Sequence, residues 1–186
     1  MMAIGERRIT AAEYFKLPET NTPIELINGV IIVSPTPFTT HQFVIANVYD
    51  LLKSLKLGGR IIFAPVELYL DEENVPQPDL IWIAQDRLSI IEPKHVRGAS
   101  DLVLEVLSPS TAKRDKSEKF YLYEKYGVRE YWIADPVAEY LEVWTLVEGA
   151  FKYIGAYGAG DTFASPLLGQ MVDVTAIFPP AEPTQL

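Results

Sequence analysis

The chain contains no cysteine among its 186 residues. This absence excludes a disulfide framework, a cysteine-ligated zinc site and catalysis by a thiol. No window approaches the ~18 consecutive apolar residues that a membrane-spanning helix needs. The opening residues also lack the basic stretch and the long apolar run of a signal peptide. We therefore predict a soluble cytoplasmic protein with no membrane partner.

Basic residues are scarce. The chain has 16 lysines and arginines against 25 acidic residues, which gives a net charge of −9. Such a surface repels a polyanion, so contact with nucleic acid requires a local basic patch. Lys113, Arg114, Lys116 and Lys119 form one candidate patch for phosphate contact. The alternative is that they mark the solvated start of a surface helix.

The hydrophobic content of 48% suits one globular domain over residues 1–186. The ends, at about 1–8 and 179–186, are expected to fray. Near the first end, Thr10 and Glu13 have the spacing of a capping box that opens a short helix. Asn28-Gly29 between two apolar runs predicts a β-hairpin, because both turn positions require positive φ.

A long amphipathic helix is expected next, from Thr39 or Thr40 to Gly58-Gly59. The apolar residues of its buried face recur at helical spacing: Val44, Val48, Leu51, Leu52 and Leu55. A strand pair, RIIFAP (60–65) and VELYL (66–70), follows it, and the polar turn after that pair leads to a strand that begins near Asp79.

The second half has the pattern of strand, helix and strand. DLVLEVL (101–107) and REYWIA (129–134) flank a helix from about 113 to 126, which Gly127 ends. Such a connection places its two strands parallel and adjacent. A closing antiparallel hairpin is expected over 140–158. The predicted fold class is α+β (mixed α/β), with helices packed on a mixed sheet.

Two carboxylates lie on the predicted strands. Asp79 opens the run PDLIWIA, although a Pro-Asp pair is also a common turn starter. Glu105 interrupts the apolar run LVLEVL, in which both faces of the strand are apolar. A buried, unpaired carboxylate is costly, so Glu105 must meet a cation, a metal ion or solvent at the sheet end.

Asp115, Lys119 and Tyr123 recur at i, i+4 and i+8 and share one helix face. One interpretation is an ion pair on a solvated helix. The other is that this face lies against the sheet near Glu105. Two acids that bind a divalent ion, with a lysine beside them to activate water, suggest a metal-dependent phosphodiesterase.

Several motifs occur in a characteristic order. They are Glu25-Leu26-Ile27-Asn28-Gly29, Ser34-Pro35, His41, Pro78-Asp79, Glu105 to Thr111, Asp115, Lys119, Tyr123, Gly127-Val128, Glu130-Tyr131-Trp132 and Asp135-Pro136. In this order the chain resembles the Uma-two family of restriction-endonuclease-like proteins, in the PD-(D/E)XK nuclease superfamily. The resemblance spans nearly the whole chain.

The resemblance implies a restriction-endonuclease-like core, a mixed β-sheet flanked by helices, with an N-terminal helix and β-hairpin. It also implies a Mg²⁺ or Mn²⁺ ion held by Asp79, Glu105 and the backbone carbonyl of Val106. Glu25 would be a further acidic contributor. The alternative for Glu25 is an ordinary exposed glutamate of a hairpin strand.

The chain departs from the superfamily at the lysine. That residue usually lies two positions after the acid on the same strand, where this chain has Leu107. The resemblance therefore assigns its role to Lys119 on the next helix. If the shared helix face lies against the sheet, Asp115 or Tyr123 would orient Lys119. His41 would contact phosphate or ligand, or else serve as a capping or packing residue.

We expect a metal-dependent endonuclease that cleaves phosphodiester bonds of nucleic acid, with DNA as the first candidate. Cutting both strands of a duplex would favour a homodimer. One alternative is a catalytically silent nucleic-acid-binding or dimeric interaction module. A hydrolase of sugars that uses paired carboxylates is a third interpretation, in which the lysine would have no role.

Overall fold

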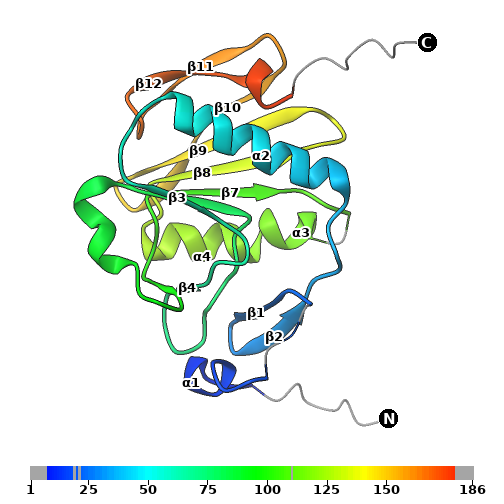
Figure 1. Ribbon diagram of the computed structural model, residues 1–186, viewed down its shortest axis with the longest axis vertical. Helices are drawn as coiled ribbons and strands as arrows, with labels where there is room; N and C mark the ends of the chain where they lie inside the picture. The colour runs from blue at the N-terminus through cyan, green and yellow to red at the C-terminus, as the bar shows by residue number, and fades with distance from the viewer. Residues whose placement is uncertain (1–7, 19, 21, 110, 179–186) are drawn as a thin grey trace.

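A six-stranded mixed sheet forms the centre of the protein (Figure 1). The computed structural model describes residues 8–18, 20, 22–109 and 111–178. The ends expected to fray lie, apart from Arg8, outside these residues, as does Ser110. In spatial order the strands are β10 (Ala150–Gly158), β9 (Tyr140–Val147), β8 (Glu130–Asp135), β7 (Leu102–Val106), β5 (Leu80–Ile83) and β3 (Arg60–Phe63).

The pairing of these strands follows the predicted pattern in the second half of the chain. β7 and β8 run parallel, as expected from the strand–helix–strand order. β8, β9 and β10 continue as antiparallel neighbours, and the last two form the predicted closing hairpin. β5 and β3 complete the sheet in antiparallel fashion on the other side of β7. The mixed sheet confirms the α+β class.

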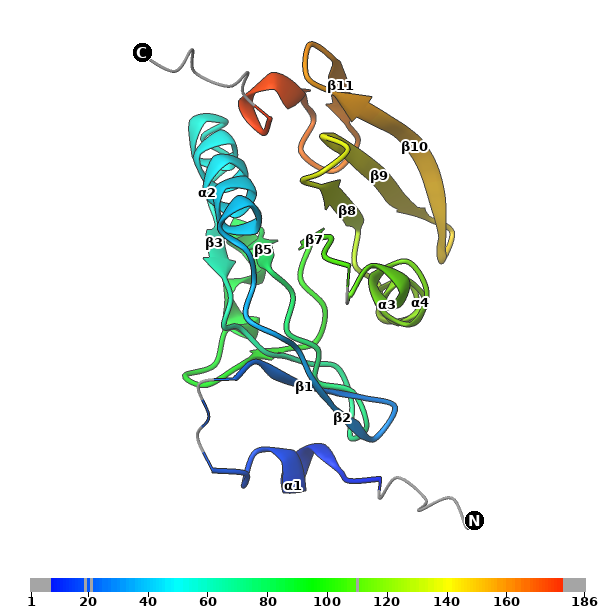
Figure 2. The same ribbon diagram turned by 90° about the vertical axis from the view of Figure 1, so that its right-hand side faces the viewer.

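Helices cover both faces of the sheet. α2 (Thr39–Ser54) packs on one face, and α3 (Ala112–Asp115) with α4 (Glu118–Tyr126) packs on the other (Figure 2). Leu104 of β7 faces the apolar core beneath α2, whereas Val103 faces the core that contains Tyr123 of α4. Every residue of β7 is buried, as its two apolar faces predict. Within the described residues, no helix is long and apolar enough to cross a membrane.

A smaller unit lies at the end of the molecule opposite α2 (Figure 1). It consists of α1 (Ala11–Tyr14) and the hairpin of β1 (Ile24–Ile27) and β2 (Val30–Val33). The capping box of Thr10 and Glu13 is formed, and Asn28-Gly29 turns with φ angles of 51° and 74°. Both local predictions are confirmed.

The hairpin is joined to the segment that leads into β5. Leu26 pairs with Val75, and both pack against Ala11 and Tyr14 of α1 in a small apolar core. The Tyr14 hydroxyl also donates to Glu67, which lies just before β4 (Leu68–Tyr69). Given these shared contacts, we propose that the hairpin unit and the sheet belong to one domain.

Two further strand pairs complete the structure. β4 pairs in parallel with β6 (Val96–Arg97), beyond the 3₁₀ segment η1 (Gln85–Ile90). β11 (Thr162–Ser165) and β12 (Gln170–Asp173) form a hairpin on the α2 side, followed by η2 (Val174–Ala176). Buried Glu130 anchors this hairpin, because it accepts hydrogen bonds from the Ser165 hydroxyl at 2.8 Å and from the Leu167 N–H at 3.0 Å.

The strand pair expected over 60–70 was wrong. β3 pairs with β5 and not with the following segment, whose strand β4 pairs with β6. Pairing with β5 places Ile61 and Ile62 of β3 on the two apolar cores, one on each face of the sheet. This pairing partly buries both side chains, whereas the predicted pattern considered neighbouring segments alone.

Two helix boundaries also differ from expectation. The helix predicted over 113–126 is two helices, because the Ser117 hydroxyl donates to the Lys113 carbonyl at 2.6 Å and its backbone leaves helical geometry. Gly127 does end α4, with a φ of 86°. α2 ends at Ser54, before Gly58-Gly59, and Lys56 already has a positive φ of 52°.

Candidate active site

Asp79 and Glu105 meet at the edge of the sheet that is formed by strand ends, where β5 begins and β7 ends. β5 and β7 are antiparallel with Leu80 opposite Leu104, so the residue before Leu80 lies level with the residue after Leu104. The Val106 N–H donates to Asp79 Oδ2 at 2.7 Å, which fixes the orientation of this carboxylate. The structure therefore brings the two acids of the Pro-Asp and LVLEVL motifs to the same place.

Lys119 and Tyr123 approach Glu105 from α4. Lys119 Nζ lies 3.0 Å from Glu105 Oε1, and the Tyr123 hydroxyl donates to the same oxygen at 2.6 Å. The three side chains are buried, with exposed fractions of 3% for Glu105, 4% for Lys119 and 0% for Tyr123. The face that carries Lys119 and Tyr123 lies against the sheet and not in solvent.

Lys119 is shared by carboxylates from three elements. Its Nζ is 3.0 Å from Glu25 Oε2 of β1 and 3.8 Å from Asp115 Oδ1 at the end of α3, besides its contact with Glu105. We call these four residues the carboxylate–lysine cluster. Arg114 Nη1 approaches Glu25 Oε1 at 3.6 Å, as a second cation at the edge of the cluster. Glu25 is thus buried within the site and is not an exposed hairpin residue.

The cluster is buried and holds more negative than positive charge, and both features shift the pKa values of its members. Burial raises the pKa of Glu105 well above its ordinary value; Lys119 opposes this shift, and Asp115 and Asp79 add to it. Burial also raises the pKa of Asp115, from 3.8 to about 6. Burial disfavours the charge of Lys119, but Glu105 and Glu25 outweigh it and raise the pKa of the ammonium. The Lys119 ammonium therefore stays charged, and its three carboxylate neighbours share this one cation.

We expect Asp115→Asn to stabilise the metal-free protein near neutral pH. Because the folded state holds the Asp115 proton up to a pKa of about 6, against 3.8 for the ordinary group, stability falls as pH rises between these values. Removing the carboxylate should raise the free energy of unfolding by about 2–3 kcal/mol at pH 7 and by little at pH 4. Urea unfolding in chelator at both pH values measures this difference. An equal effect at the two pH values would contradict it.

His41 contacts Asp79 from the opposite face of the sheet. It lies in the first turn of α2, is 8% exposed, and places Nε2 3.1 Å from Asp79 Oδ2. Its Nδ1 is buried and has no hydrogen-bond partner among the described residues. The sequence suggested a phosphate contact or a capping and packing role, and gave no sign of the contact with Asp79. That contact depends on the packing of α2 over the point where β5 begins.

The four residues of the predicted basic patch have different contacts in the structure. Lys119 is inside the cluster, Arg114 reaches Glu25, and Lys116 Nζ lies 2.8 Å from Glu142 Oε2 of β9. Lys113 is exposed. The structure therefore does not bring these four side chains together as one cationic surface.

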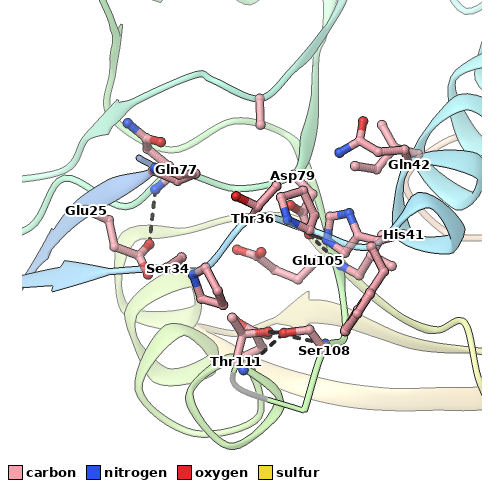
Figure 3. A pocket seen from close by; sticks show the side chains of 18 of the residues that line it. Glu25, Ser34, Thr36, His41, Gln42, Gln77, Asp79, Glu105, Ser108 and Thr111 are labelled. Carbon is pink, nitrogen blue, oxygen red and sulfur yellow. Dashed lines mark hydrogen bonds and ion pairs between the residues drawn. The ribbon is translucent and has the colours of Figure 1, made fainter. Parts of the chain in front are cut away.

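A pocket of about 340 Å³ opens beside the cluster. In Figure 3 Glu25 lies on one side of it and His41 on the other, with Asp79 and Glu105 between them. The loop after β7 closes another side, where the Ser108 and Thr111 hydroxyls are 3.0 Å apart. Sequence reasoning missed Gln77, whose N–H donates to Glu25 Oε2 at 3.3 Å, although it directly precedes Pro78-Asp79.

Comparisons with known proteins agree with this fold. The Uma2 family, described as "Putative restriction endonuclease", matches residues 11–175. The "Uncharacterized protein sll1609" of Synechocystis sp. (strain ATCC 27184 / PCC 6803 / Kazusa) is 32% identical over 142 residues, 73% of this chain and 80% of that protein. The crystal structure of "a putative nuclease belonging to DUF820" from Anabaena variabilis ATCC 29413 superposes with a TM-score of 0.75 at 20% identity, over 91% of this chain and 97% of the other. The resemblance seen in the sequence is confirmed, and the chain belongs to the Uma2 family.

Proposed function

We propose that the protein is a metal-dependent endonuclease that hydrolyses phosphodiester bonds of nucleic acid, with DNA as the first candidate substrate. One observation carries the proposal: a buried lysine lies 3.0 Å from Glu105, at the sheet edge where Asp79 also lies, beside an open pocket. A solvated helix would not bury an ammonium in this way. The family match and the fold of the neighbouring structure support the same class of enzyme.

The acidic residues fit a divalent ion. Asp79, Glu25, Glu105 and Asp115 gather around one lysine and one arginine, so a further cation would relieve their mutual repulsion. Among the described residues, no group of three or more acidic or histidine side chains is arranged so that it could hold a metal ion by itself. Mg²⁺, however, is commonly held by one or two carboxylates together with water and substrate phosphate. Asp79, Glu105 and the Val106 carbonyl would form such a site, with Glu25 as a further contributor.

The surrounding residues have distinct roles in this proposal. A bound divalent ion would supply Lewis-acid activation of water and of the phosphoryl group. Lys119 would place its ammonium beside the attacked phosphate and stabilise developing negative charge. Tyr123 would orient Glu105 through its 2.6 Å hydrogen bond, and His41 would orient Asp79. Lys113 is exposed and would contact phosphate. A homodimer would allow both strands of a duplex to be cut.

Cleavage assays with several substrates test the proposed function. Supercoiled DNA, linear duplex, single-stranded DNA and RNA would be incubated with Mg²⁺, Mn²⁺ or chelator. We expect cleavage of at least one substrate with metal and none with chelator, because water activation depends on the ion. Cleavage that persists in chelator would contradict metal dependence. No cleavage of any substrate would contradict the nuclease assignment.

A catalytically silent binding module on the same fold is the second candidate. Two observations favour it. The net charge is −9, and Glu105 Oε1 already accepts hydrogen bonds from Lys119 and Tyr123. Such a module need not bind a divalent ion. Metal binding at Asp79 and Glu105 therefore separates the two candidates.

A further inference from the structure

Two aromatic side chains that the cleavage chemistry does not require line the pocket. Phe38 and Phe63 both line it, with exposed fractions of 68% and 54%. Neither ring belongs to the two large apolar cores of the described chain. Exposed phenylalanines that border a charged site are available to contact a ligand.

Each aromatic side chain is attached to an element of the site. Phe38 is the N-cap residue of α2, three positions before His41. Phe63 ends β3 opposite Leu80, the residue that follows Asp79, and the Ala64 N–H donates to the Asp79 carbonyl at 2.9 Å. The Tyr49 ring meets the Phe63 ring edge to face, with centroids 5.8 Å apart. The backbone positions of both phenylalanines are thus fixed relative to the acids.

The reactive end of the pocket is recessed. Glu105 and Lys119 are at most 4% exposed, and the Asp79 side chain is 19% exposed. The volume of about 340 Å³ is near the lower end of the ~300–1,000 Å³ range of ligand pockets. A duplex presents its phosphates along a broad rod and is normally bound by an extended basic surface. Among the described residues that line the pocket, Lys119 is the only lysine or arginine, and the chain carries a net charge of −9.

Building on the proposed endonuclease function, we infer that the pocket binds one unstacked nucleotide of a single-stranded nucleic acid. Its base packs against Phe38 and Phe63, and its phosphodiester lies toward Asp79, Glu105 and Lys119. The lining of the pocket combines aromatic side chains with charged ones, which matches the two parts of a nucleotide. Every base has a π face, so stacking tolerates any sequence. Stacking also replaces much of the attraction that a basic groove would supply.

Fluorescence anisotropy with labelled oligonucleotides tests this inference. The native chain would be titrated into single-stranded DNA, single-stranded RNA and blunt duplex DNA of equal length, with calcium in place of magnesium. We expect at least one single strand to bind about tenfold more tightly than the duplex. Phe38→Ala and Phe63→Ala should each weaken single-strand binding by roughly 5- to 100-fold, because each removes a stacking surface. The DNA and RNA titrations identify the sugar that is accepted.

Phe43→Ala is the matched control. Phe43 is 65% exposed on α2 but does not line the pocket, so its loss should leave binding unchanged within about twofold. Phe38→Tyr should retain binding, because it keeps an aromatic face. The inference is overturned by duplex binding as tight as single-strand binding, by no single-strand binding, or by alanine variants that bind like the native chain.

The outcome is separable from that of the proposed function. Metal-dependent cleavage that is indifferent to Phe38 and Phe63 would support the endonuclease and overturn the single-strand pocket. Single-strand binding that depends on both phenylalanines, without cleavage in any metal, would support the pocket and overturn the endonuclease.

Discussion

Asp79→Asn is expected to lower metal-dependent cleavage at least about a thousandfold while the protein remains folded. Asparagine removes the charge that would hold a divalent ion, but it keeps an oxygen that can accept the Val106 N–H hydrogen bond now seen at 2.7 Å. The Asp79 side chain is 19% exposed, so little packing is altered. Initial cleavage rates at saturating Mn²⁺, together with thermal unfolding of each protein, measure the two effects.

Asp50→Asn is the control for this substitution. Asp50 is an exposed residue of α2 that does not line the pocket, and its change should leave the cleavage rate unaltered. If Asp79→Asn cleaved at the native rate, Asp79 would have no part in catalysis. Loss of cleavage accompanied by unfolding would attribute the effect to stability and not to the site.

Lys119→Met should produce the largest loss of stability. The ammonium lies within 3.0 Å of Glu25 and Glu105 and 3.8 Å from Asp115, and all four side chains are buried. Removing the cation leaves three buried carboxylates to repel one another, which should lower the free energy of unfolding by about 3–5 kcal/mol at pH 7. Denaturant unfolding in chelator measures this loss.

The pH dependence gives this prediction a definite sign. Asp115 and Glu105 already have raised pKa values, and loss of Lys119 raises them further. The variant should therefore recover stability relative to the native chain as pH falls from 7 to 5. Lys116→Met is the matched control: its ammonium pairs with Glu142 at 2.8 Å but is 38% exposed, so the cost should stay within about 1 kcal/mol. Equal costs for the two variants would contradict this account of the cluster.

Local chemistry allowed much of the fold to be predicted from the sequence. The capping box at Thr10, the Asn28-Gly29 turn and the Gly127 helix end depend on neighbouring residues alone. The parallel pairing of β7 and β8 follows from the handedness of a strand–helix–strand connection. Glu105 was identifiable because it lies in a strand with two apolar faces.

Long-range contacts explain what the sequence did not reveal. Glu25 joins Lys119 across more than 90 positions of the chain, and nothing near Glu25 indicates that its strand lies against α4. His41 reaches Asp79 only because α2 packs over the edge where β5 begins. Lys116 lies at the end of α3, just before the break at Ser117, and pairs with Glu142 of β9, so it does not extend the cluster. Periodicity identifies faces of helices and strands, but it does not identify which faces meet.

The hairpin unit therefore contributes to the site as well as to the fold. β1 supplies Glu25, and the segment after β2 borders the pocket through Ser34 and Thr36 (Figure 3). In the proposed enzyme this unit adds both negative charge and a wall to the pocket. Its attachment through Leu26 and Val75 fixes the position of that wall.

Anomalous diffraction from crystals grown with Mn²⁺ tests the central claim, that the edge at Asp79 and Glu105 holds a divalent ion, most directly. Our account predicts one strong manganese peak within coordination distance of both carboxylates and of the Val106 carbonyl, and its absence from crystals of Asp79→Asn. Saturating Mn²⁺ with no peak at this edge, or with peaks only elsewhere, would contradict the metal-dependent site and favour the silent binding module.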